Sequence, residues 1–184
     1  MTTPTPSFPI SRPVSPADVP PLGTHVTIEP DAATRAELAR LAGALSVESF
    51  HAEFLVKPWG TDGYAVEGRV TAELTQACVV TLEPVGTRVD EPVALKLVPP
   101  EAMARYEETP DEEGGIDLDP SAEIPDPIED GVIDLGRVAV EHFLVGVDPY
   151  PRKEGAVFDA EAAGVGEGRE KTSPFAALAR LAKE

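Results

Sequence analysis

The feature that most constrains this fold is the stretch 68–99, in which apolar and polar side chains alternate in two successive runs. Apolar residues take every second position: Val70, Ala72 and Leu74, then Val89, Val93, Leu95 and Leu97. This period of two is typical of strands with one buried face. The sequence Glu-Pro-Val-Gly at 83–86 separates the two runs and favours a turn. The stretch therefore predicts the central antiparallel pair of a sheet.

Further elements are predicted on both sides of this pair. Residues 46–57 also alternate, and 8–14 and 25–28 are short strand candidates. A helix is expected over 32–44, with Asp31 as its N-cap and a buried stripe made by Leu38, Leu41 and Leu45. A second helix follows its N-cap Asp134 and ends near residue 148. We expect an α+β fold with a twisted antiparallel sheet and two main helices, and periodicity leaves open whether the sheet closes like a barrel.

The distribution of proline and charge predicts the domain boundaries. We expect a flexible arm at 1–7, a single domain at 8–155 and a flexible tail at 156–184. Within the domain, 107–130 holds many carboxylates and no basic residue, so a mobile acidic loop is expected there. The tail contains a short helix candidate, 173–181, whose Phe175, Leu178 and Leu181 are in line. This helix suits packing on its own domain and docking to a partner equally well.

The net charge restricts the classes of partner. A formal charge of -18 argues against non-specific binding to DNA or other phosphate backbones, because such binding requires Lys and Arg. An acidic surface suits basic partners, or it serves only solubility. The sequence contains no membrane-length apolar run and no signal-peptide pattern. We therefore expect a cytoplasmic protein without membrane contact.

No motif in the chain supports catalysis. The single cysteine, Cys78, lies in an apolar run, and a distant His51 or His142 would have to serve as its base. A cysteine in such surroundings is usually inert. The three histidines are scattered, and no phosphate-binding glycine loop follows a strand. The sequence predicts no catalytic residue, no metal site and no cofactor, and hence a protein that is not an enzyme.

Five ordered motifs resemble the bacterial YceD family, and in particular its alphaproteobacterial branch. They occupy 8–14, 76–85, 133–136, 148–152 and 173–181. The resemblance implies a role in the accumulation, processing or stability of large-subunit ribosomal RNA. Many members resemble Cys-x-x-Cys at the central turn, whereas here Thr81 stands where the second cysteine would be. This departure favours a structural role for Cys78 over thiol or metal chemistry.

Two hypotheses combine the charge with the resemblance. In the first, the protein binds a basic ribosomal protein or assembly factor, and the acidic loop imitates RNA. In the second, Arg12, Arg69, Arg152 and Lys153 form a local patch that contacts ribosomal RNA directly. We prefer the first. The motifs supply the candidate partner-binding residues, which are Arg12, Gln76, Cys78, Glu83, Asp134, Tyr150, Arg152 and Lys153.

Overall fold

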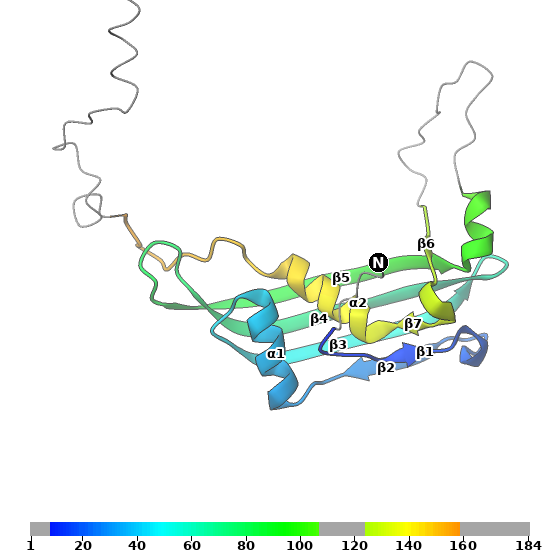
Figure 1. Ribbon diagram of the computed structural model, residues 1–184, viewed down its shortest axis with the longest axis horizontal. Coiled ribbons are helices and arrows are strands. Elements are labelled where there is room, and N and C mark those ends of the chain that lie inside the picture. The colour runs from blue at the N-terminus through cyan, green and yellow to red at the C-terminus, as the bar shows by residue number, and fades with distance from the viewer. Residues whose placement is uncertain (1–7, 107–123, 159–184) are drawn as a thin grey trace, which may run out of the picture.

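The computed structural model describes residues 8–106 and 124–158, and its main element is a five-stranded sheet (Figure 1). The strand order is β2-β3-β4-β5-β6, and only β6 runs parallel to its neighbour. The strands are β2 (Thr24–Ile28), β3 (Ser46–Trp59), β4 (Gly63–Ala77), β5 (Pro84–Val98) and β6 (Asp126–Pro127). The predicted α+β fold and the central pair, β4 with β5, are confirmed.

The sheet is open, so the barrel-like closure that the sequence left possible does not occur. Its edge strands β2 and β6 pair only with β3 and β5. Closure requires the edge strands to pair with each other through a continuous ladder. With five residues in β2 and two in β6, the edges are too short to form one.

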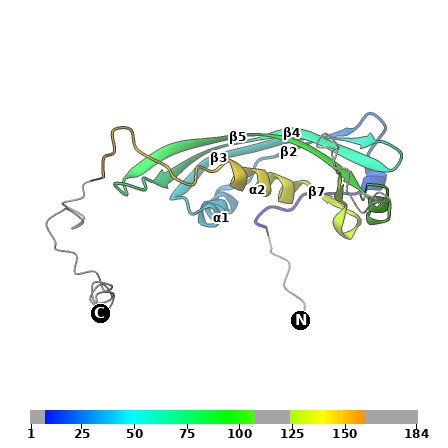
Figure 2. The ribbon, with the colours of Figure 1, turned by 90° about the horizontal axis from the view of Figure 1, so that it is seen from above.

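The two predicted main helices are present, and both cover the same face of the sheet (Figure 2). They are α1 (Ala32–Ala42) and α2 (Leu135–Gly146), and three short 3-10 helices, η1 (Pro16–Asp18), η2 (Pro100–Arg105) and η3 (Glu129–Gly131), complete the helical elements. Alternate side chains of β3 and β4 point into the core beneath them, including Phe50, Phe54 and Val70. The rings of Phe50 and Phe143 meet edge to face, with 5.6 Å between their centroids. Such aromatic pairs add about 0.5–1.5 kcal/mol to the stabilisation from burial.

Helix α1 begins and ends through recognisable caps. The Asp31 carboxylate accepts a hydrogen bond from the Thr34 N–H, and Gly43 ends the helix with a φ of 65°. A left-handed C-terminal residue is usually glycine, because glycine lacks the Cβ that strains this conformation. The expected stripe is wrong in part, because Leu38 is buried while Leu41 and Leu45 are exposed. Helix α1 packs on β3 through Leu38 and Ala39, whereas Leu41 lies outside this buried side and Leu45 follows the helix after Gly43.

The N-terminal segment packs beneath the sheet, away from its edge. Within the predicted strand 8–14, only β1 (Pro13–Val14) is extended, and it pairs with β7 (Ile133–Asp134) in a separate two-stranded sheet. Asp134 joins these parts: its carboxylate accepts from the Arg12 N–H at 2.7 Å, the Ser11 hydroxyl at 2.8 Å and the Gly136 N–H at 2.9 Å. Asp134 is thus both the predicted N-cap of α2 and an anchor for the N-terminal segment.

The acidic stretch is ordered where it re-enters the domain. Pro125 and Ile128 are buried, and the Ile128 N–H donates to the Val98 carbonyl at 2.8 Å. Part of the expected loop, 124–130, is thus attached to the domain by these contacts, and the mobility expected for 107–130 stays a prediction. Residues 107–123, the arm 1–7 and the predicted tail helix 173–181 lie outside the described residues.

The opposite face of the sheet, which we call the outer face, carries exposed charges. Arg69 pairs with Asp90, Arg88 contacts Asp90 at 3.6 Å, and Lys57 lies 2.7 Å from Glu67. Opposite charges on adjacent strands stabilise their pairing by roughly 0.2–1 kcal/mol. In the part of the chain that the structure describes, no helix is long and apolar enough to cross a membrane.

Candidate functional site

Six of the eight predicted binding residues gather at one end of the molecule. Gln76, Cys78 and Glu83 lie at the end of β4 and in the turn that follows it. Tyr150, Arg152 and Lys153 lie in the segment after α2. The Val79 N–H donates to the Pro151 carbonyl at 2.9 Å and joins the turn to this segment. The Lys153 ammonium lies 3.0 Å from a Glu83 carboxylate oxygen.

The remaining two residues, Arg12 and Asp134, lie together near the start of α2. Their contact is between the Arg12 backbone N–H and the Asp134 carboxylate. Asp134 is engaged in capping α2, as described above, and its pKa is lowered. Burial alone would raise this pKa, but the hydrogen bonds from Arg12, Ser11, Arg137 and Gly136 outweigh burial. The structure thus gives Asp134 a structural task.

Gln76 connects three elements at the clustered end. Its Nε2 donates to the Asp148 carbonyl at 2.9 Å, and its Oε1 accepts from the Thr87 hydroxyl at 2.7 Å. Gln76 is only 6% exposed, so both contacts replace hydrogen bonds to water. The side chain therefore fixes the segment after α2 against β4 and β5.

Cys78 is the first residue of the turn between β4 and β5. The Cys78 N–H donates to the Glu83 carbonyl at 2.8 Å, and the Leu82 N–H donates to the Cys78 carbonyl at 2.9 Å. The sulfur is fully buried and lies 3.4 Å from the backbone nitrogens of both Lys153 and Val80. Hydrogen bonds from the Lys153 N–H, from the side chain and N–H of Thr81 and from the Val80 N–H lower the Cys78 pKa to about 6, against the effect of burial.

Thr81 occupies the position of the second cysteine and faces the first. Its side chain hydrogen-bonds to Cys78, so a neutral hydroxyl stands where a second thiol would stand. Among the residues that the structure places, no three His, Cys, Asp or Glu side chains are grouped to hold a metal ion.

Neither histidine considered as a base is directed to Cys78. His51 lies on the outer face and contacts Glu29 at 3.0 Å, whereas Cys78 is buried at the sheet's end. The Nδ1 of His142 lies 2.9 Å from the Val138 carbonyl of its own helix. A nucleophile must also reach its substrate, and the Cys78 sulfur has no exposed surface. The arrangement favours a structural role for this thiol.

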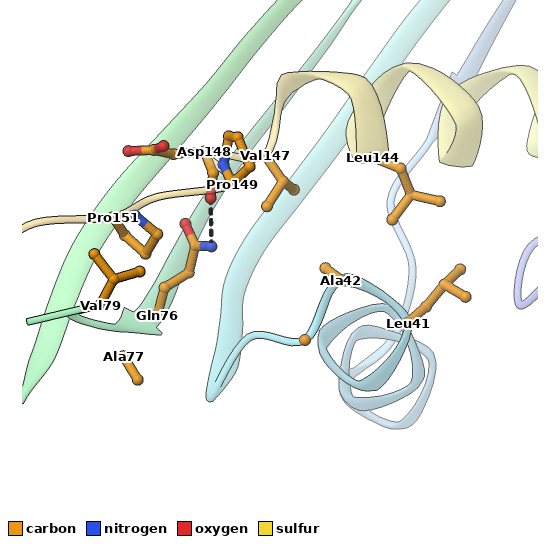
Figure 3. A pocket seen from close by; sticks show the side chains of 11 residues that line it. Leu41, Ala42, Gln76, Ala77, Val79, Leu144, Val147, Asp148, Pro149 and Pro151 are labelled. Carbon is orange, nitrogen blue, oxygen red and sulfur yellow. Dashed lines mark hydrogen bonds between the residues drawn. The ribbon is translucent and has the colours of Figure 1, made fainter. Parts of the chain in front are cut away.

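An open groove lies beside this cluster, between the C-terminal ends of α1 and α2 (Figure 3). Its volume is about 420 Å³. Leu41 and Ala42 come from α1, Leu144 comes from α2, and Val147 follows α2 directly. Most of the remaining lining is made by Gln76, Ala77, Val79, Asp148, Pro149 and Pro151. We call this the α1–α2 groove.

Exposed apolar side chains line the groove or lie in the segments that adjoin its lining residues in sequence. We call this set the hydrophobic end, and its members are between 45% and 79% exposed: Leu41, Leu45, Val79, Leu82, Val145 and Tyr150. Sequence reasoning identified only Tyr150 as a binding residue. It assigned Leu41 and Leu45 to the core because their spacing continues the stripe of Leu38. Clusters of exposed apolar groups commonly mark interaction surfaces.

The four cations of the RNA hypothesis do not form one patch. Arg69 lies on the outer face and pairs with Asp90, while Lys153 pairs with Glu83 at the hydrophobic end. Arg12 precedes β1, close to the start of α2, and Arg152 lies beyond the other end of that helix. The structure therefore brings only Arg152 and Lys153 together.

Fold and site define a small α+β protein with an open sheet, a helix-flanked groove and an exposed hydrophobic end. Residues 66–182 match the family described as large ribosomal RNA subunit accumulation protein YceD, and the chain belongs to this family. The family name implies involvement in accumulation of the large-subunit ribosomal RNA. The match includes β5, α2 and the Cys78 turn, whereas α1 and β3 precede it. No curated protein and no solved structure matches the chain.

Proposed function

We propose that this protein supports the accumulation, processing or stability of large-subunit ribosomal RNA by binding a basic ribosomal protein or assembly factor, without catalysing a reaction. Family membership supports the involvement with ribosomal RNA. The charge and the exposed apolar surface of the chain support a protein as the direct partner.

The observation that carries the proposal is that the protein's own carboxylates contact most of its described Lys and Arg side chains. The chain has a formal charge of -18, and most described Lys and Arg side chains contact a carboxylate of the protein itself. These are Arg40, Lys57, Arg69, Arg88, Arg105, Arg137 and Lys153. Phosphate binding depends on cations that displace counterions, so this surface favours a basic partner over an RNA backbone.

The part of the hydrophobic end outside the groove, at Leu82 and Tyr150, is the surface that we assign to the partner. Leu82 and Tyr150 are 77% and 73% exposed, and the carboxylate of Glu83 is adjacent. A rigid tyrosine beside apolar groups is a common anchor in protein interfaces. Acidic neighbours would orient a basic partner and exclude other acidic proteins.

The test begins with affinity capture from lysate, with and without ribonuclease. We expect a basic ribosomal protein or assembly factor to remain after ribonuclease treatment and to be identified by mass spectrometry. That protein is then purified, and its dissociation constant is measured by calorimetry. The Leu82→Ser, Tyr150→Ala double variant should weaken binding about tenfold or more. Leu22→Ser is the matched control, because Leu22 is 93% exposed but precedes β2, away from the hydrophobic end.

The alternative is direct binding of ribosomal RNA through Arg152 and Lys153. If every captured protein is released with the RNA, this alternative replaces the proposal. In that case Arg152→Ala with Lys153→Ala should abolish the RNA complex. The logarithm of affinity should then depend on salt with a slope of roughly one or two phosphate contacts.

A further inference from the structure

Apolar side chains contribute to the walls of the α1–α2 groove, whose polar surface is slightly larger, and nothing among the described residues packs over them. Leu41 and Val79 line it and are 49% and 45% exposed. Leu144 and Val147 are partly buried and lie on the opposite wall. Figure 3 shows these side chains around the cavity. Covering such side chains gains roughly 25 cal/mol for each Å² of apolar surface removed from water.

We propose that residues 173–181 of the same chain bind in the α1–α2 groove. The first reason is the path of the chain. Pro149 and Pro151 line the groove, and the last described residue, Phe158, follows Pro151 by seven positions. Seven residues carry the chain at most about 25 Å away. Residues 159–172 then span up to about 46 Å, which is enough to return 173–181 to the groove.

The second reason is the pattern of the segment itself. Ser173 and Pro174 are typical of a helix start, and Phe175, Leu178 and Leu181 follow at intervals of three. A helix of this length extends about 13 Å and presents these three side chains along one face. Residues 159–172 contain no aromatic or leucine side chain, so 173–181 is the apolar part of the remaining chain.

The third reason is that the segment is covalently connected to the domain close to the groove. A segment tethered near its site binds as if present at roughly millimolar concentration, so a weak intrinsic affinity suffices. A free helix from another protein would have to compete with it. This inference does not rest on the proposed function.

Disulfide trapping tests the inference in the full-length chain. Cysteines replace Leu41 and Leu178 in a Cys78→Ser background, and formation of the intrachain disulfide is followed by gel mobility. The matched control places cysteines at Leu22 and Leu178. Leu22 precedes Gly23, which lies against Leu55 and Lys57, whereas α1 ends near Ser46 at the other end of β3. We expect the Leu41 pair to oxidise at least about tenfold faster.

Equal oxidation rates for the two pairs would overturn the inference. Disulfide-linked dimers without the intrachain product would also overturn it and would assign the groove to a second copy. A second measurement avoids any effect of replacing Cys78. Amide hydrogen exchange over 36–45 is compared between the natural chain and Leu178→Ser, with Val165→Ser as control.

We expect exchange over 36–45 to be several-fold faster in Leu178→Ser and unchanged in Val165→Ser. Identical exchange rates over 36–45 in all three purified chains would show that the tail does not occupy the groove. That result would contradict the inference whatever the outcome for partner binding, so failure of the inference and failure of the proposed function are distinguishable.

Discussion

Gln76 is the buried polar side chain of the described domain, and its two partners explain why an amide lies there. Gln76→Leu keeps the volume but leaves the Asp148 carbonyl without its donor and removes the shorter contact of the Thr87 hydroxyl, which also lies 3.4 Å from the Leu74 carbonyl. Such losses cost about 1–3 kcal/mol of unfolding free energy, which urea denaturation measures. Thr27→Val on the exposed side of β2 is the control and should change stability little. Equal effects from both substitutions would contradict the assigned role.

The unfolding free energy should depend on pH through the thiol of Cys78. Its pKa is lowered from the ordinary 9.0 to about 6 by hydrogen bonds to the thiolate. A lowered folded-state pKa means that the thiolate contributes full stability above pH 9, and that this contribution is lost as the pH falls through about 6. The unfolding free energy of the natural chain relative to Cys78→Ser should therefore rise between these values. The ultraviolet absorbance of the thiolate checks the pKa directly, and a midpoint near 9 would refute it.

At the scale of elements, Asp134 connects α2 to the N-terminal segment. Asp134→Ala removes the helix cap and the acceptor for Ser11 and Arg12, so we expect a loss of roughly 2 kcal/mol in unfolding free energy. Asp134→Asn keeps one oxygen acceptor and should lose less. Partner binding should survive both substitutions at temperatures where the protein stays folded. A binding defect in stably folded Asp134→Asn would show that this residue contacts the partner after all.

The elements that sequence predicts well are those with many repeats of one period. β3, β4 and β5 each contain long alternations, and α2 has a wide apolar stripe beginning after a clear N-cap. β1, β6 and β7 have two residues each, too few to display a period. Their pairing depends on contacts between distant segments, such as the Ile128 N–H with the Val98 carbonyl.

The same limit applies to the candidate site. Sequence motifs selected Gln76, Cys78, Tyr150 and Lys153, but not the contacts that join them. The error at Leu41 and Leu45 has a physical cause: the buried side of α1 is made by Leu38, Ala39 and the partly buried Ala42, and Gly43 ends the helix before Leu45. The groove lies between the C-terminal ends of α1 and α2, with Leu41 and Ala42 on one side and Leu144 and Val147 on the other (Figure 3).

At the scale of the whole molecule, the acidic charge and the exposed apolar side chains Leu82 and Tyr150 should make separable contributions to partner binding. The acidic stretch 107–123 holds eight carboxylates and no cation. The test variant replaces four of these carboxylates with Gln, at Glu107, Glu108, Glu112 and Glu113. It should bind the basic partner about tenfold more weakly at low salt, mainly because association is slower. The difference should shrink as salt rises, because the screening length falls from about 10 Å at 0.1 M to about 3 Å at 1 M.

The matched control removes the same number of charges elsewhere, at Asp18, Glu29, Glu53 and Glu73, which are exposed on the folded domain. Stopped-flow association rates at several salt concentrations compare the two variants. If the acidic stretch attracts the partner locally, its variant slows association more than the control does. If both slow association equally, only net charge matters and the stretch has no special role.

The Leu82→Ser, Tyr150→Ala variant should instead accelerate dissociation with little dependence on salt, because it removes apolar contacts that counterions do not screen.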